Sequence, residues 1–302
     1  MKPSFAVVGA GVSGSFAAWT LRKATSASVK VFEMGRGSGG RCSSRKSREM
    51  PGFYVDHGCP AFTASSKLLG WKEIVQELEK KKIVEEWKCS AGFLSASGEP
   101  SAASCPPLYR GIGGMETMCE KLLEDCDVSF NTVVRNVERE GSKWILYNKN
   151  EEELARVDHL VISSLAIACS LRWDRIFGGI APLVKSAEML QEPSLIELSK
   201  QLDENGDNAS PVFSVLMGFK REKADWLADL PFDLSIVQGH QDISKVVKNR
   251  CDTANYDTVV VHSTHSFAAD ATDVFGSQSA VSRLQEKSAS TLEKNKVYKL
   301  RP

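Results

Sequence analysis

The chain has 302 residues, of which 42% are hydrophobic and 25% charged, and its 38 basic and 38 acidic side chains give a formal net charge of zero. These values are typical of a globular protein with one large or two modest cores. A neutral chain lacks the surplus of Lys and Arg that attracts nucleic acids or anionic membranes, so we expect neither as a partner. No apolar run reaches about 18 residues, so we predict no membrane span.

The chain contains eight cysteines, which form no CxxC pair and show no spacing typical of zinc sites or disulfide-rich domains. We therefore expect no metal site and interpret most cysteines as small buried side chains in a reducing compartment. A redox or covalent role for Cys42 and Cys59, which lie beside the motifs described below, is the alternative. No presequence precedes Met1, so we expect a cytoplasmic protein, with an organelle as the open alternative.

The first predicted element is a strand over residues 5–8, an apolar run that ends directly in Gly9-Ala10-Gly11-Val12-Ser13-Gly14. Small residues over 15–21 then predict a helix. In such a unit the first glycine permits the tight turn, the second lets the backbone approach a pyrophosphate, and the third lets the helix pack on the strand. The N–H groups and the positive dipole end of the helix N-terminus also favour phosphates, so the motif predicts a dinucleotide site.

A second predicted strand over residues 29–32 ends at Glu33, 19 positions after Gly14, where an acidic residue binds a ribose hydroxyl. The next segment, Arg36-Gly37-Ser38-Gly39-Gly40-Arg41, is a second glycine cluster between two arginines and is suited to binding a diphosphate. A flexible basic loop is the alternative interpretation. Glu33 would repel a 2′-phosphate, which disfavours NADP.

A third motif follows at Asp56-His57-Gly58-Cys59-Pro60-Ala61-Phe62-Thr63. With the two glycine clusters before it, the chain resembles the flavin amine-oxidase superfamily, and most closely its renalase-like group. Members of that group carry a glycine motif, a Gly-Gly-Arg segment and an Asp-x-Gly-Ala-x-Phe/Tyr-x-Thr segment in this order. This chain departs in the third motif, where Cys59 replaces the alanine and Pro60 replaces the glutamine of many relatives, which removes a side-chain hydrogen-bond partner and an N–H.

The resemblance implies FAD as the cofactor. It places Ser13 and Arg41 at the diphosphate, Glu33 at the adenosine ribose, and the backbones of Pro60 and Ala61 at the flavin. No catalytic side chain is implied, because the isoalloxazine accepts the hydride while the protein orients the donor. The predicted cofactor-binding residues, including Val134 from a later strand, are Gly9, Gly11, Ser13, Gly14, Glu33, Arg36, Gly40, Arg41, Pro60, Ala61 and Val134.

The rest of the chain alternates strands and helices. Helices are predicted at 66–82, 116–123 and 188–202, loops at 95–107 and 203–208, and strands at 83–87, 92–94, 128–137, 144–147, 157–163, 212–219 and 258–264. The resemblance places the backbone of Val134 at the adenine, and a purely structural strand valine is an equal alternative. His262 and His265 are interpreted as strand-end histidines, because their spacing gives a poor set of metal ligands.

These elements predict an α/β protein with a Rossmann-like FAD-binding domain and a discontinuous second, substrate domain of mixed sheet plus helices. The FAD-binding domain is expected at residues 1–62 and 108–170, and the substrate domain at 63–107 and 171–302. The resemblance implies oxidation of a small amine or of a reduced, NAD(P)H-type nicotinamide substrate, with oxygen as the acceptor. The oligomeric state is left open.

The C-terminus departs from the resembled family, whose members close the FAD domain with a strand ending in Gly-Asp and a helix of small residues. Here 281–299 is rich in Lys, Glu and Ser, and the only Gly-Asp, Gly206-Asp207, lies in a polar loop. We therefore expect a shortened isoform or a truncated gene model. The alternatives to an active flavoenzyme are a catalytically inactive product that binds FAD weakly or not at all, and a protein that binds NAD or NADP.

Overall fold

The computed structural model describes residues 2–48, 53–64, 69–207, 210–250 and 255–269. The chain forms two compact units, each made of two separate segments. The first unit comprises Met1–Ser43 and Glu116–Ala209, and the second comprises Ser44–Met115 and Ser210–Pro302. Parallel strands with helices in the first unit and a six-stranded mixed sheet in the second confirm the predicted α/β class. Among the described residues, no helix is both long enough and apolar enough to cross a membrane.

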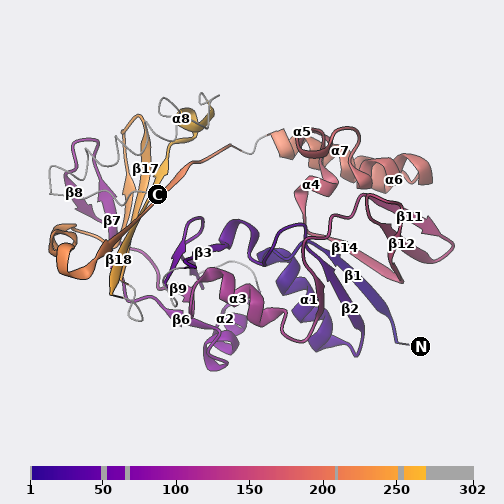
Figure 1. Cartoon of the computed structure of the whole chain (residues 1–302), viewed down its shortest axis with the longest axis horizontal. Coiled ribbons are helices and arrows are strands. Elements are labelled where there is room, and N and C mark those ends of the chain that lie inside the picture. The colour runs from indigo at the N-terminus through magenta and orange to yellow at the C-terminus, as the bar shows by residue number, and fades with distance from the viewer. Residues whose placement is uncertain (1, 49–52, 65–68, 208–209, 251–254, 270–302) are drawn as a thin grey trace. The chain divides into compact units, whose positions relative to one another are not determined.

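The first unit contains a sheet of four parallel strands in the order β10-β2-β1-β14 (Figure 1). Its strands and the two helices nearest them are β1 (Ser4–Val8), α1 (Val12–Ala24), β2 (Ser28–Phe32), α3 (Met115–Leu122), β10 (Asp127–Ser129) and β14 (His159–Ile162). The apolar run at the start of the chain forms the central strand β1, which has a strand on either side. A central parallel strand is buried on both faces, which explains why this run lacks polar alternation.

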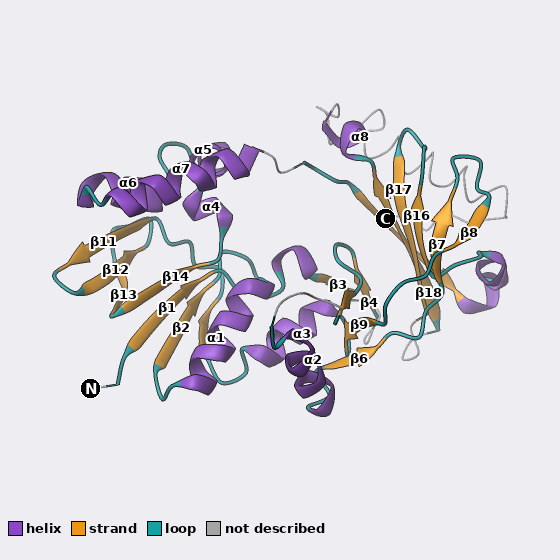
Figure 2. Ribbon diagram, turned by 180° about the vertical axis from the view of Figure 1, so that it is seen from behind, coloured by secondary structure: helices purple, strands orange, loops and turns teal. Residues whose placement is uncertain are grey.

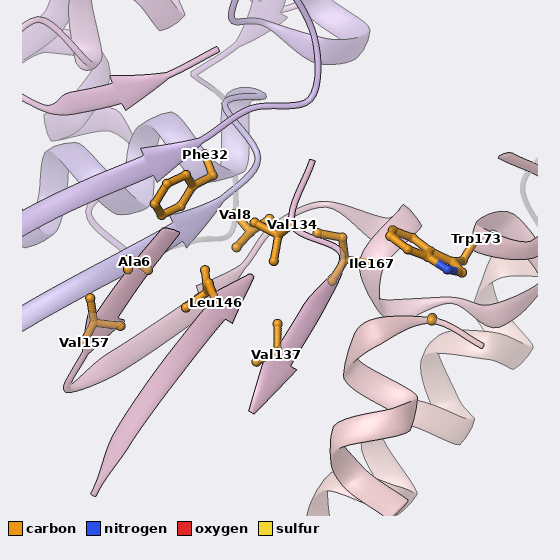
Figure 3. Close-up of a cluster of buried hydrophobic side chains, with 11 residues drawn as sticks. Ala6, Val8, Phe32, Val134, Val137, Leu146, Val157, Ile167 and Trp173 are labelled. Atoms are coloured by element: carbon orange, nitrogen blue, oxygen red, sulfur yellow. The ribbon is translucent and has the colours of Figure 1, made fainter. Parts of the chain in front are cut away.

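Successive side chains of β1 point to opposite faces of this sheet. Val7 packs with Ala18 of α1 and Val31 of β2 on one face. Ala6 and Val8 pack on the other face against residues of a three-stranded antiparallel sheet, as Figure 3 shows. That sheet consists of β11 (Asn136–Glu140), β12 (Lys143–Tyr147) and β13 (Glu153–Val157). The unit is therefore layered, with α1 and the antiparallel sheet on opposite faces of the parallel sheet (Figure 2).

Four further helices complete the first unit, namely α4 (Leu165–Ala168), α5 (Ser170–Phe177), α6 (Pro182–Leu190) and α7 (Pro193–Asp207). The helix predicted over 188–202 is wrong as one element, because Gln191 adopts a left-handed conformation with φ of 50° and α7 begins at Pro193. Proline breaks the ladder of a continuous helix but fits its first turn. The loop predicted at 203–208 is also wrong over 203–207, which continue α7.

The second unit contains a six-stranded sheet in the order β15-β18-β17-β16-β7-β8 and two smaller sheets, β3-β4 and β5-β9-β6. The elements from its first segment are β3 (Ser44–Lys46), β4 (Tyr54–Asp56), β5 (Phe62–Thr63), α2 (Trp71–Lys80), β6 (Val84–Glu86), β7 (Ala91–Leu94), β8 (Pro100–Ala102) and β9 (Leu108–Gly111). Those from its second segment are β15 (Ser214–Lys220), β16 (Leu234–Val237), β17 (Ile243–Arg250), β18 (Tyr256–Ser263) and α8 (His265–Ala269). Short 3-10 turns occupy Gly40–Cys42, Arg221–Lys223 and Asp225–Asp229.

Several boundaries differ from those predicted. The strand expected over 128–137 is two strands, β10 and β11, and the loop expected over 95–107 includes β8. The compact units also divide the chain at other positions than the predicted domains, because residues 44–62 and 108–115 group with the second unit and 171–209 with the first. In the latter segment, Asp203 accepts the amide hydrogen of Ser170, and Ser186 donates to the carbonyl of Val137 in β11. These bonds tie the helices to the first unit. The predictions for 281–299 lie outside the described residues.

Candidate functional site

The turn between β1 and α1 requires glycine at two positions. Gly9 has φ of +107°, a conformation that other residues rarely adopt, and its N–H donates to the carbonyl of Phe32 at 2.8 Å. A Cβ on Gly14 would lie 1.9 Å from the carbonyl oxygen of Gly9, so the backbone leaves no space for it. The hydroxyl of Ser163 donates to the carbonyls of Val8 and Gly9 from the adjacent strand end. Gly9 and Gly14 therefore shape the turn.

The second glycine cluster packs directly against this turn. The N–H of Gly39 donates to the carbonyl of Ala10 at 2.8 Å, and Gly39 forms an isolated parallel bridge with Gly11. A Cβ on Gly40 would lie 3.4 Å from the Cα of Gly11, whereas a Cβ on Gly11 would meet only ordinary contacts, 3.9 Å from the Gly39 carbonyl and 4.0 Å from the Gly40 Cα. The two predicted glycine clusters thus form one surface that is nearly free of side chains. We call it the glycine cradle.

Glu33 connects the two parts of the glycine cradle. One carboxylate oxygen accepts the N–H of Ala10 at 2.7 Å, and the other accepts the N–H of Gly35 at 2.6 Å. Hydrogen bonds from N–H groups to a carboxylate are among the stronger ones in proteins, so Glu33 holds the loop after β2 against the first turn. Each carboxylate oxygen has a second lone pair that can still accept a hydroxyl hydrogen. The predicted ribose contact of Glu33 is compatible with this geometry and stays a prediction.

The cradle contains a buried polar atom without a partner. The side chain of Ser38 is only 2% exposed, and its Oγ has no hydrogen-bond partner among the described residues. A buried hydroxyl without a partner is costly, and such groups occur in sites that complete their hydrogen bonds with a ligand or water. Arg36 and Arg41 flank the loop with exposed guanidinium groups that have no ion-pair partner in the described part of the chain. The loop thus offers a hydroxyl and two cations for a ligand.

The N-terminus of α1 opens onto the same surface. Gly11 is the N-cap of α1 and has no side chain that could cap the first amides of the helix. The first turn of α1 contains no acidic side chain. Ser13 is exposed in this first turn. The amides of the first turn of a helix have no partner within the helix, and the helix dipole places partial positive charge there. The arrangement favours a phosphate or carboxylate at the cradle.

A pocket lies on the other side of Glu33 within the first unit. It is partly open to solvent, and its lining includes Gly9, Glu33, Met34, Val134, Trp173 and Phe177. The wall formed by Trp173 and Phe177 has ring centroids 4.5 Å apart, and the guanidinium of Arg135 lies 5.0 Å and 4.7 Å from these two rings. An apolar, aromatic wall beside a carboxylate suits a flat heteroaromatic base joined to a sugar.

Val134 also lines this pocket. Its side chain is 1% exposed and points into the hydrophobic core, as Figure 3 shows. Before Val133, the N–H of Thr132 donates to the carbonyl of Glu33. After Val134, the N–H of Arg135 donates to the carbonyl of Tyr147. Within the described residues, the backbone groups of Val133 and Val134 between them have no backbone partner. The backbone role in adenine binding stays a prediction.

Pro60 and Ala61 belong to the second unit, in the loop between β4 and β5. The Sγ of Cys59 lies 3.1 Å from the carbonyl of Ala61. In the same loop, the carbonyl of His57 accepts the hydroxyl of Ser214 at 2.8 Å and lies 2.9 Å from the Nε2 of His262. These bonds fix the loop on strands β15 and β18. The flavin contacts predicted for Pro60 and Ala61 stay predictions.

Two basic groups near this loop have lowered pKa values. Burial, with the positive charge of Lys245 as the second cause, lowers the pKa of His262 to about 4. Burial also lowers the pKa of Lys245, while the nearby Cys59 thiol opposes the shift. His262 lies within β18 and His265 begins α8. The described residues contain no group of three or more His, Cys, Asp or Glu side chains placed to hold a metal ion.

The structure gathers nine of the eleven predicted site residues in the first unit around the glycine cradle and its pocket, and leaves Pro60 and Ala61 in the second. It adds Ser38, Ser163 and Trp173, which sequence reasoning did not single out. Ser38 lies inside the second glycine cluster, so its place between two glycines could have identified it as a candidate ligand-binding residue. The sequence around Trp173 contains no such indication, because the position of Trp173 in the pocket depends on how α5 packs.

Comparisons with known proteins agree with this fold. Residues 7–78 match a family described as an NAD(P)-binding Rossmann-like domain. The structure is similar to that of wild-type putrescine oxidase bound to putrescine, with a TM-score of 0.64 and 13% identity over 98% of this chain and 82% of that chain. It is also similar to cyclohexylamine oxidase from Brevibacterium oxydans IH-35A, with a TM-score of 0.65 and 12% identity over 97% and 80% of the two chains.

A third similar structure is a CLA-producing fatty acid isomerase from P. acnes, with a TM-score of 0.58 and 12% identity over 96% of this chain and 82% of that chain. At such identities the likeness shows the fold alone. Because proteins named as oxidases and an isomerase share this fold, the reaction must be argued from the site.

Proposed function

We propose that the chain is an FAD-dependent oxidoreductase of the flavin amine-oxidase type, and specifically of its renalase-like group. Its reaction would be hydride transfer from a small amine or a reduced nicotinamide-type substrate to the flavin, with oxygen as the final acceptor. The proposal rests on the resemblance of three consecutive sequence motifs and on the geometry of the glycine cradle. The amine oxidases among the similar structures support the same reaction class.

The single observation that carries the proposal is the glycine cradle with its unsatisfied polar groups. The cradle joins a helix N-terminus, the buried hydroxyl of Ser38 and the exposed Arg36 and Arg41, which have no ion-pair partner among the described residues. These are the donors that a diphosphate needs, because its oxygens accept hydrogen bonds and carry two negative charges. The residues present therefore fit the diphosphate of a dinucleotide.

The chain's own residues would then act by binding and orientation. Gly11 and Gly40 let the diphosphate approach the backbone, Arg41 neutralises its charge, and Glu33 accepts a ribose hydroxyl. The backbone of Val134 and the wall of Trp173 enclose the adenine. A bound flavin supplies the hydride-accepting chemistry, so the site needs no triad or carboxylate pair.

NAD is the alternative ligand, and the description of the family that matches residues 7–78 favours it. Both dinucleotides place a diphosphate on a glycine turn and a ribose on an acidic residue, so the first motif does not separate them. The second glycine cluster favours FAD in our interpretation, because it adds Arg41 to the diphosphate site.

The test is a set of binding titrations with FAD, FMN and NAD, followed by protein fluorescence. FMN lacks the adenosine half, for which the first unit provides Glu33 and the aromatic pocket. We expect FAD to bind at least tenfold more tightly than FMN or NAD. Replacing Arg41 with Ala removes one charged hydrogen-bonding group and should weaken FAD binding about tenfold or more.

Arg22→Ala is the matched control, because Arg22 is an exposed cation in the same unit near the C-terminal end of α1. At about 1.5 Å per residue it lies well over 10 Å along the helix from the cradle, so FAD affinity should not change. Tighter binding of NAD than of FAD would replace the flavin proposal. A folded protein that binds none of the three ligands would support the inactive alternative.

A further inference from the structure

Cys89 and Cys105 lie at the two ends of the β7–β8 hairpin in the second unit. β7 and β8 pair antiparallel, with Gly92 opposite Ala102 and Leu94 opposite Pro100. The pairing ends there; if this register continued for three residues beyond the Gly92–Ala102 pair, Cys89 would lie directly opposite Cys105.

The neighbouring pair of strands gives nearly the same juxtaposition. β6 and β9 pair with Glu86 opposite Tyr109, and the amide of Trp87 still donates to the carbonyl of Leu108 at 2.8 Å. If this second register continued, Cys89 would lie opposite Pro106, which is next to Cys105. Opposite residues of antiparallel strands have Cα atoms about 4.5–5.5 Å apart, within the roughly 4.4–6.8 Å that a disulfide spans. Both thiols are free in this structure.

The two thiols have different surroundings. Cys105 is exposed, and the two prolines that follow it, Pro106 and Pro107, favour an extended backbone there. Cys89 is half-buried, and burial, followed by the charge of Asp233 and the Cys105 thiol, raises its pKa to about 11. Cys105 is therefore the thiol that meets a soluble oxidant first.

We propose that Cys89 and Cys105 form a reversible disulfide when hydrogen peroxide oxidises the protein. In the first step the sulfur of Cys105 attacks one peroxide oxygen, the O–O bond breaks, and Cys105 becomes a sulfenic acid while water leaves. In the second step the sulfur of Cys89 attacks the sulfur of Cys105, its proton and the sulfenic hydroxyl leave as water, and the S–S bond forms. Two thiols lose two electrons and hydrogen peroxide gains them. The proposal does not depend on the nucleotide site.

The disulfide would act on an edge of the six-stranded sheet. β8 is the outermost strand on that side and is exposed along its length. A covalent bond between Cys89 and Cys105 closes the base of this hairpin and limits its opening. We therefore expect amide hydrogen exchange over residues 91–102 to slow about tenfold on oxidation, with no change in the first unit.

The test uses the full chain and peptide mapping after digestion with trypsin. Trypsin cleaves after Lys88 and Arg110 and leaves both cysteines in one peptide, 89–110. The reduced protein is treated with hydrogen peroxide, blocked with N-ethylmaleimide and digested. We expect this peptide to be lighter by two hydrogens and unlabelled. Chymotrypsin, cleaving after Leu94, should then give two fragments that separate only on reduction.

Two serine variants check the order of the steps. In Cys89→Ser, Cys105 should accumulate as a sulfenic acid that dimedone traps, whereas in Cys105→Ser, Cys89 should stay labelled by maleimide. The proposal is overturned if the wild-type peptide carries a dimedone adduct at Cys105 beside a labelled Cys89. It is also overturned if urea-unfolded protein forms the same disulfide as fast as the folded protein, because the strand register would then contribute nothing.

Discussion

Gly11 and Gly14 lie three positions apart in one motif but have different surroundings. A Cβ on Gly14 would collide with a backbone oxygen, whereas a Cβ on Gly11 would make only van der Waals contacts with the second glycine cluster. Gly11 has φ of −71°, which any residue adopts. Gly14 is thus required for the fold of the turn, whereas the absence of a side chain at Gly11 leaves space for a ligand to approach the backbone.

We therefore predict opposite outcomes for two alanine variants. Gly14→Ala should lower the free energy of unfolding by about 3 kcal/mol or more, because backbone atoms must move. Gly11→Ala should cost about 1 kcal/mol, as for alanine at an N-cap, but should weaken FAD binding at least tenfold. Urea unfolding and FAD titration measure the two effects. Unchanged FAD affinity in Gly11→Ala would contradict the approach of the diphosphate at this position.

His262 makes the stability of the chain depend on pH. Its side chain is 7% exposed and its pKa is lowered from 6.5 to about 4, mainly by burial. Between these values the unfolded chain binds a proton that the folded chain does not, so stability falls as the pH falls from 6.5 towards 4 and is constant above that window. The contribution is on the order of 3 kcal/mol.

His262→Gln tests this dependence, because a glutamine amide can still donate to the carbonyl of His57 but does not titrate. Urea unfolding at pH 7.5 and pH 5 should show a smaller loss of stability for the variant than for the wild type. An equal loss in both proteins would assign the pH dependence to other groups.

At the scale of elements, a buried carboxylate organises the start of the second unit. Asp56, at the end of β4, accepts the hydroxyl of Ser44 in β3 and the amide of Met115 at 2.9 Å, and it is only 6% exposed. Gly114 fits beside it without a side chain, because a Cβ there would lie 2.8 Å from the Ser44 hydroxyl. The Asp of the third motif therefore has a structural role in this chain.

Asp56→Ala should leave two buried donors without this acceptor and lower the free energy of unfolding by about 2–4 kcal/mol. Asp56→Asn keeps an oxygen acceptor at the same place and should cost less than half as much. Thermal and urea unfolding of the two variants measure the difference. Equal losses would show that the negative charge, rather than the two hydrogen bonds, matters at this position.

Elements with a strong local signal were predictable from the sequence. An apolar run, a glycine turn and a second strand ending in Glu33 specify β1, α1 and β2, because each depends on neighbouring residues. The break at Gln191 and the separation of β10 from β11 were missed, because tertiary packing and one left-handed residue decide them. Likewise, the cradle residues could be read from two motifs, whereas Trp173 enters the pocket only through the packing of α5.

At the scale of the whole molecule, each unit is assembled from two segments that are distant in the sequence. The sequence predicted a discontinuous organisation, but not that residues 44–62 and 108–115 would group with the second unit or 171–209 with the first. Those assignments depend on long-range strand pairing and helix packing, such as the antiparallel pairing of Phe62 with Tyr109. Local patterns contain little information about such contacts.

The flavin proposal is tested most directly by the visible spectrum of the purified full chain after reconstitution with excess FAD. Our account predicts a bound flavin spectrum that bleaches when a dihydronicotinamide or a small amine is added without oxygen, and returns when air is admitted. A folded protein that retains no flavin absorbance after removal of free FAD would contradict the account.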